Sequence, residues 1–215
     1  MAEPKSAPSA RSALRQIRLV TYVGLAAIAG LWGGWWIAAA CGWLPQPTMM
    51  AAAPIGGPFT LVDHNGRTVT DQTFRGRWML VFFGYTRCPD ACPMALSEMS
   101  QALDALGPLA ERVQPLFVSV DTERDTPETM RGFFDAFDPR ILGLAGSAEQ
   151  VAAAARAYRA FYRRVDQGSD YTMDHSTLLY VMGPDGRYVT AFNHQTGGDV
   201  VGQRLRALVA GAPAS

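Results

Sequence analysis

Hydrophobic residues in this chain form one long block followed by several short ones. The long block, residues 19–40, contains 22 uncharged and mostly apolar residues, and the next charged residue is Asp63. As a helix with a rise of about 1.5 Å per residue, it would be about 33 Å long, enough to cross the hydrocarbon core of a bilayer. The pattern therefore predicts a transmembrane helix over residues 19–40.

The short blocks that follow alternate between strand and helix patterns. β-prone runs at 59–62 and 68–70 flank Asn65-Gly66, a dipeptide typical of a tight hairpin turn. Continuous apolar runs at 78–83 and 115–120 predict strands buried on both faces. Further strands are predicted at 141–144, 176–182 and 188–192. Helices are predicted at 94–106, 127–137, 148–162 and 200–209. Thr126 is expected to cap the helix at 127–137, and Ser147 the helix at 148–162. This order predicts an α/β fold, a mixed sheet with helices on both faces.

The residues around the long block predict its orientation. Arg11, Arg15 and Arg18 precede it, and tryptophans gather toward its far end. Basic residues favour the cytoplasmic side, and indole rings favour the membrane interface. We therefore expect residues 1–18 to be a cytoplasmic basic head, 19–40 a single-pass anchor in a bacterial inner membrane, 41–56 a proline-containing linker, and 57–215 a periplasmic domain.

Two other interpretations of the block stay open. A cleavable signal peptide would have an apolar region of roughly 7 to 15 residues, shorter than this one. Ala38-Ala39-Ala40-Cys41 resembles a degenerate bacterial lipoprotein signal, in which Cys41 would carry the lipid. All three interpretations place the domain outside the cytoplasm.

Composition narrows the classes of protein. The chain has 19 basic and 19 acidic residues, 48% hydrophobic residues and three cysteines. These totals exclude a disulfide-dense mini-protein, a disordered chain and a polybasic nucleic-acid binder. The zero net charge is an average, because the head carries +3 and the domain −3.

Cys88 and Cys92 lie where a predicted buried strand gives way to a helix. A helix N-terminus favours thiolate, the form that both binds metals and attacks disulfides. On one helix, residues four apart have Cβ atoms about 5–6 Å apart, whereas a relaxed disulfide needs about 3.5–4.5 Å. A disulfide between them would need local distortion, while a metal ion tolerates the wider gap but requires a third ligand.

The chain has three histidines. His64 lies beside the first predicted turn and is expected to be exposed. His194 follows the last predicted strand in a polar stretch and is expected to be solvated. His175 directly precedes an apolar strand, and the residues alone leave open whether its role is structural or ligating.

Several blocks, in order, resemble the Sco/SenC family of membrane-anchored, thioredoxin-like copper proteins. The resemblance runs from Gly57 to about Phe192. The matching stretches are Gly57-Pro58-Phe59-Thr60-Leu61, Val81-Phe82-Phe83-Gly84-Tyr85-Thr86, Cys88-Pro89-Asp90-Ala91-Cys92-Pro93, the segment from Val120 to Pro127, and Asp174-His175-Ser176. Arg87 stands where relatives often have His, and Thr122 where they usually have Pro.

The resemblance implies a ligand set and a function. Cys88, Cys92 and His175 would bind one copper ion per domain, as Cu(I) or Cu(II). The protein would be a metallochaperone that delivers copper to the dicopper centre of cytochrome c oxidase subunit II, with a separate copper donor protein. In the alternative function, Cys88 and Cys92 form the redox pair of a thiol-disulfide reductase that keeps the subunit's cysteines reduced. A peroxiredoxin-type peroxidase is disfavoured, because that family has a Thr-x-x-Cys arrangement. Here Thr86 stands only two residues before Cys88.

Several neighbouring residues have structural interpretations. Asp90 is expected to cap the following helix. An ion-pair network beside the site is expected of three residues, with a surface for the partner as the alternative: Asp121, Arg124 and Asp125. Packing is the expected role of three further side chains, with shielding of copper as the alternative role: Tyr85, Tyr171 and Met173.

Overall fold

The structure, a computed structural model, describes residues 10–41 and 54–211. The chain divides into two compact units, Met1–Ala52 and Ala53–Ser215. Most of the predicted linker at 41–56 and the first half of the predicted head at 1–18 lie outside the described residues. So does Trp43, the tryptophan that follows the apolar block.

The first unit contains a long helix, α1 (Ala10–Ala40). Within it, Arg18–Ala40 is 23 residues long with a mean hydropathy of 1.5, long and apolar enough to cross a membrane. Its large apolar side chains are exposed, Trp32 to 69% and Leu31 to 74%. The predicted N-terminal apolar helix is confirmed. The second half of the predicted head is also helical, so the basic residues Arg11, Arg15 and Arg18 lie on the same helix as the apolar segment.

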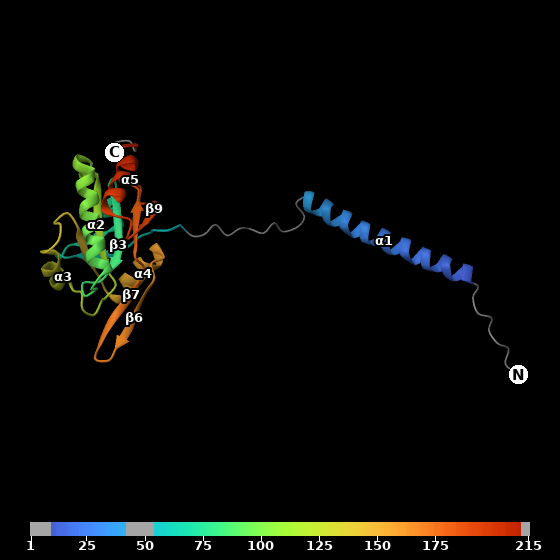
Figure 1. The fold of residues 1–215 in the computed structure, drawn as a ribbon, viewed down its shortest axis with the longest axis horizontal. Coiled ribbons are helices and arrows are strands. Elements are labelled where there is room, and N and C mark those ends of the chain that lie inside the picture. The colour runs from blue at the N-terminus through green and yellow to red at the C-terminus, as the bar shows by residue number, and fades with distance from the viewer. Residues whose placement is uncertain (1–9, 42–53, 212–215) are drawn as a thin grey trace. The chain divides into compact units, whose positions relative to one another are not determined.

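The second unit is a mixed α/β domain (Figure 1). Its strands are β1 (Thr60–Asp63), β2 (Thr68–Thr70), β3 (Trp78–Gly84), β4 (Val113–Ser119), β5 (Leu142–Ala145), β6 (Tyr162–Gln167), β7 (Asp170–His175), β8 (Leu178–Met182) and β9 (Tyr188–Asn193). Its α-helices are α2 (Ala91–Leu106), α3 (Pro127–Phe134), α4 (Ala148–Tyr158) and α5 (Gly198–Gly211), with short 3-10 turns at Asp71–Phe74 and Gly107–Arg112.

Seven strands form one sheet in the order β2-β1-β5-β4-β3-β8-β9. The central strands β3, β4 and β5 are parallel, and the flanking pairs are antiparallel. Every residue of β3 is buried, as its continuous apolar sequence predicts. The thioredoxin-like mixed sheet is therefore confirmed.

Helices cover both faces of this sheet. Consecutive strand residues point to opposite faces, and Phe82 and Phe83 show this directly. The Phe82 ring contacts Phe117, with centroids 6.0 Å apart, and Phe117 contacts Phe134 of α3 at 5.5 Å. On the other face, Phe83 contacts Tyr158 of α4 at 5.5 Å. The core therefore lies on both sides of β3, which ends at the cysteine segment.

Some predicted boundaries are wrong. The helix predicted at 94–106 begins at Ala91, and the one predicted to reach Tyr162 ends at Tyr158, because Arg159 adopts a left-handed conformation with φ of 54°. The larger omission is the β6–β7 hairpin, which forms a separate two-stranded sheet. Its polar, alternating sequence lacks the apolar run that marked the other strands.

Candidate metal centre

The two cysteines lie at the carboxyl end of β3. Cys92 is fully buried in the first turn of α2, and Cys88 is half-buried in the loop before that helix. The pair therefore spans a loop and a helix, so the spacing argument for two residues on one helix does not apply. Gly84 makes room for the thiol, because a Cβ atom at this position would lie 2.7 Å from Cys92 Sγ.

A buried carboxylate fixes the loop that carries Cys88. Asp125 accepts hydrogen bonds from the Thr86 N–H at 2.9 Å and the Thr86 hydroxyl at 2.6 Å. The hydroxyl of Ser119, at the end of β4, donates to the same carboxylate at 2.5 Å. The loop is therefore attached to the neighbouring parallel strand as well as to β3.

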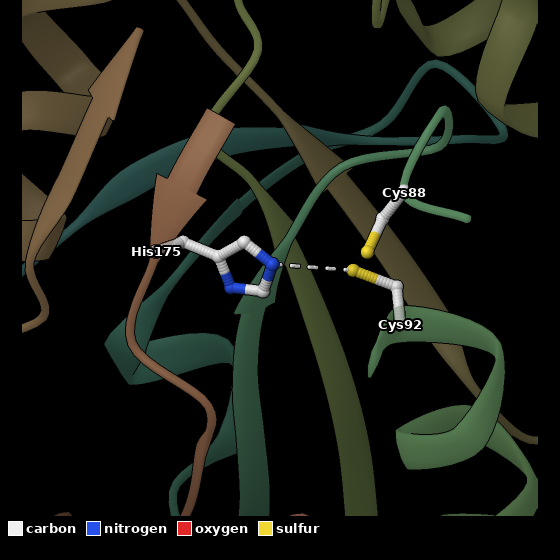
Figure 2. A group of neighbouring side chains, drawn as sticks. All are labelled: Cys88, Cys92 and His175. Atoms are coloured by element: carbon white, nitrogen blue, oxygen red, sulfur yellow. Dashed lines mark hydrogen bonds between the residues drawn. The ribbon is translucent and has the colours of Figure 1, made fainter. Parts of the chain in front are cut away.

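His175 is the last residue of β7. Its ring packs edge-on between Phe82, at 5.8 Å between centroids, and Tyr85, at 5.7 Å. Nδ1 lies 3.0 Å from the Ser176 carbonyl oxygen. Since that oxygen can only accept, Nδ1 donates to it, and Nε2 is the ring nitrogen that faces the thiols, 3.6 Å from Cys92 Sγ (Figure 2).

The three predicted side chains thus converge. The two sulfur atoms and the imidazole nitrogen all lie within 4.8 Å of one another. A three-coordinate ion with bonds of about 2.0–2.3 Å holds its donors roughly 3.5–4 Å apart, so small side-chain movements would close the group around one ion. Two thiolates and one imidazole are soft donors that suit copper, zinc or a similar metal. The trio fits a metal ion by donor type and by spacing.

The two cysteines differ in acidity. A hydrogen bond from the Cys92 thiol lowers the pKa of Cys88. This effect outweighs burial, which raises the pKa, and contacts with His175 and the N–H of Asp90 lower it further. The same contact with Cys88, together with burial, raises the pKa of Cys92. Burial opposes the charge on His175, but its contacts with Cys88 and Ser176 raise its pKa overall. Cys88 is thus the thiolate of the pair and Cys92 the thiol.

Two expectations near the cysteines need correction. Asp90 occupies the N-cap position of α2, yet its side chain makes no capping hydrogen bond, so the predicted cap is wrong. Asp121 and Arg124 do form an ion pair, at 2.5 Å, but Asp125 bonds to Thr86 and Ser119 instead of joining it. The bonds of Asp125 to Thr86 and Ser119 were not predicted from the sequence.

The packing expected of the neighbouring aromatic and methionine side chains is present. Tyr85 and Met173 are buried, and the Tyr85 hydroxyl lies 3.1 Å from the Thr172 hydroxyl of the hairpin. Tyr171 is half-buried against Arg124. Arg87 is exposed beside Cys88.

The other two histidines lie outside this group. His64 is half-buried, and the prediction that it is exposed is wrong, because its Nδ1 accepts from the Gly143 N–H at 3.0 Å and its ring stacks on Phe134. Burial lowers its pKa. His194 is also half-buried rather than solvated, and its main-chain N–H donates to the Thr177 carbonyl oxygen.

Comparisons with known proteins agree on one family. Residues 47–210 match the SCO1/SenC family. The chain is 45% identical over 138 residues to Protein SenC of Rhodobacter capsulatus, covering 64% of this chain and 62% of SenC. It is 41% identical over 142 residues to the mitochondrial Protein SCO1 homolog of Homo sapiens, covering 64% of this chain and 47% of that protein.

Solved structures agree with the sequence comparison. The copper-bound structure of Bradyrhizobium japonicum ScoI superposes with a TM-score of 0.67 at 45% identity, covering 71% of this chain and 98% of that one. The chain spans about half the length of the curated relatives that it matches. On the family match and the agreement of fold, this chain belongs to the SCO1/SenC family.

Proposed function

We propose that this protein is a copper metallochaperone, which holds one copper ion between Cys88, Cys92 and His175. The observation that carries the proposal is the convergence of two sulfurs and one imidazole nitrogen within 4.8 Å. Membership of the SCO1/SenC family and similarity to the copper-bound ScoI structure support copper as the metal. Such a donor set suits Cu(I), and an imidazole also suits Cu(II).

The geometry is also suited to giving the ion up. Three protein donors leave a coordination position for an incoming ligand of the acceptor. Cys92 is fully buried, whereas Cys88 and His175 are partly exposed, so exchange would begin on the exposed side. We propose the dicopper centre of cytochrome c oxidase subunit II as the acceptor and a separate protein as the copper donor.

Copper titration of the full-length protein in detergent tests this function. We expect one copper per reduced chain, none after oxidation of Cys88 and Cys92, and loss of tight binding in His175→Ala. Full maturation of the oxidase by His175→Ala would contradict delivery of copper from this site, and failure of the reduced protein to bind copper would exclude it.

A second function, reduction of a disulfide in the acceptor, is favoured by the unequal acidity of the cysteines. The Cys88 thiolate would attack the acceptor disulfide, forming a mixed disulfide and releasing one acceptor thiolate. Cys92 would then lose its proton and attack the Cys88 sulfur, so that the acceptor leaves as a dithiol and Cys88–Cys92 is oxidised to a disulfide. His175→Ala should retain this exchange, which separates the two functions.

We propose that α1 anchors the protein in a bacterial inner membrane by a single pass. Residues 1–18 would then be cytoplasmic, 41–56 a linker, and 57–215 a periplasmic domain. The exposed apolar surface of Arg18–Ala40 and the basic residues before it support this arrangement. A membrane-impermeant thiol reagent should label cysteines placed in the domain, but not in residues 1–18, of intact spheroplasts.

A further inference from the structure

The candidate metal centre is assembled from two parts that no shared sheet connects. The cysteines follow β3 of the seven-stranded sheet, whereas His175 ends β7 of the separate β6–β7 sheet. Figure 1 shows this hairpin extending away from the larger sheet. In the part of the chain that the structure describes, no ladder bonds join the hairpin to the larger sheet. The chain connection from His175 to β8, which begins at Leu178, and side-chain contacts therefore together place the imidazole.

One arginine makes two of those polar contacts, beside the pairs Arg164–Glu123 and Tyr85–Thr172. Arg124, whose side chain is only 12% exposed, pairs through Nε with the buried carboxylate of Asp121 at 2.5 Å. Its Nη1 donates to the Tyr171 carbonyl oxygen at 3.0 Å and to the Asp170 carboxylate at 3.0 Å. Arg124 therefore links the loop after β4 to the main chain of β7, four residues before His175.

Tyr171 completes the connection. Its hydroxyl donates to the second oxygen of Asp121 at 2.8 Å. The guanidinium carbons of Arg124 and Arg164 each lie 3.6 Å from the centroid of its ring. Two cations cannot occupy the same face at that distance, so they lie on opposite faces and the ring is sandwiched between them.

The same loop also holds the cysteine side of the site. Residues 119–125 contain Asp125, which fixes Thr86 two residues before Cys88, and Asp121, which receives Arg124 and Tyr171. This loop therefore connects both halves of the centre through buried carboxylates.

We propose that Arg124 and Tyr171 are positioning residues, which hold the hairpin so that His175 faces Cys92. The proposal rests on the metal-binding function proposed above, and it concerns geometry: neither side chain belongs to the donor set. Apolar packing of Met173 keeps the hairpin on the domain, and the contacts of Arg124 and Tyr171 set its angle.

The test compares full-length variants in detergent. Tyr171→Leu removes the sandwiched ring and its hydroxyl but keeps the Arg124–Asp121 pair, so no buried charge is left alone. Arg124→Gln removes the guanidinium that connects Asp121 to the main chain of β7. Arg163→Gln is the matched control, because among the described residues Arg163 on the same hairpin forms an ion pair only with Asp174 of the neighbouring strand. His175→Ala gives the reference for a lost imidazole.

Three measurements are made: Cu(I) affinity by competition with bicinchoninate, the imidazole nitrogen hyperfine signal of the Cu(II) form, and the reduction potential of the Cys88–Cys92 couple. We expect Tyr171→Leu and Arg124→Gln to bind Cu(I) about 10- to 100-fold more weakly, as when supporting contacts around a metal ligand are lost. The nitrogen signal should weaken while the potential stays at the wild-type value. Arg163→Gln should match wild type throughout.

A copper-free measurement gives an independent result. Hydrogen exchange should become faster at residues 170–176 in both variants and stay unchanged at residues 84–92. If Arg124→Gln does not fold, Tyr171→Leu carries the test alone.

Wild-type affinity and nitrogen signal in Tyr171→Leu would overturn the positioning role, as would a potential that shifts together with the affinity. If wild type binds no copper, or if His175→Ala binds it as wild type does, the proposed function itself fails.

Discussion

The two halves of the metal centre are built in different ways. The cysteine half stands on β3 and α2, where side chains are buried and neighbouring parallel strands share main-chain hydrogen bonds. The histidine half stands on a polar hairpin, joined to the domain mainly through charged and aromatic side chains. One half is therefore fixed by the core, and the other by a small number of side-chain contacts.

This difference fits the proposed function, in which the protein binds an ion and then releases it. Donors on a rigid support define the site, while a donor on a separately held element can withdraw at small cost. Three predictions test how unequal the two halves are, beginning with the largest expected effect.

The first prediction concerns the reactivity of the cysteine half. The pKa of Cys88 is lowered, so Cys88 remains a thiolate at pH values where an ordinary thiol is protonated. The pKa of Cys92 is raised, so Cys92 stays protonated. An ordinary thiol with a pKa near 8.5 is only about 3% thiolate at pH 7. We expect Cys88 of the copper-free protein to react with iodoacetamide at least about 30-fold faster than Cys92 at pH 7.

The rate at Cys88 should stay nearly constant as the pH falls from about 9 to about 6, which mass spectrometry of the alkylated peptides would measure. A rate that falls tenfold per pH unit over this range would show an ordinary thiol. Cys41, which lies outside the site, provides the internal comparison in the same chain.

The second prediction concerns packing around Cys92. Gly84→Ala would place a methyl group 2.7 Å from Cys92 Sγ and 2.8 Å from the Phe117 ring. Overpacking of this kind typically costs about 1–3 kcal/mol in the free energy of unfolding. Urea denaturation should show this loss of stability, and copper titration should show weaker binding.

Gly132→Ala in α3 is the matched control, since nothing lies within 4 Å of its added Cβ and alanine favours a helix. Equal stabilities of the two variants would contradict the tight fit inferred at Gly84.

The third prediction concerns the exposed face of the hairpin. Arg163 and Asp174 pair at 2.6 Å, but their side chains are 65% and 52% exposed. Exposed ion pairs contribute about 0–1 kcal/mol. Asp174→Asn should therefore change the free energy of unfolding by less than about 1 kcal/mol and leave Cu(I) affinity within about twofold of wild type. A larger loss would show that hairpin surface charge, beyond the contacts of Arg124, supports the centre.

The sequence predicted the core-bound half much better than the hairpin. Apolar runs mark β3 and β4 clearly, because a strand buried on both faces must be apolar throughout. The sequence of β6 and β7 carries arginines and aspartates on a short, partly exposed pair of strands, which resembles a loop in composition. Alternation around Gly168 was the available signal, and it is weak in so short a segment.

The histidines show a similar limit. His64 and His194 were expected to contact solvent because their sequence neighbours are polar. Residues distant in the sequence bury them instead, such as Gly143 and Phe134 at His64. Local composition cannot report such contacts, since burial depends on which segments meet in the folded chain.

What the sequence determined by itself is local: the apolar helix, the order of strands and helices, the capping of α3 and α4, and the two cysteines at the junction of a strand and a helix. What only the tertiary structure decided is the centre. His175 is 83 residues from Cys92 along the chain and 3.6 Å from it in space. That approach depends on Arg124 and Asp121 of one loop meeting Tyr171 of the hairpin across the fold, because directional contacts between distant residues exist only once the chain has folded.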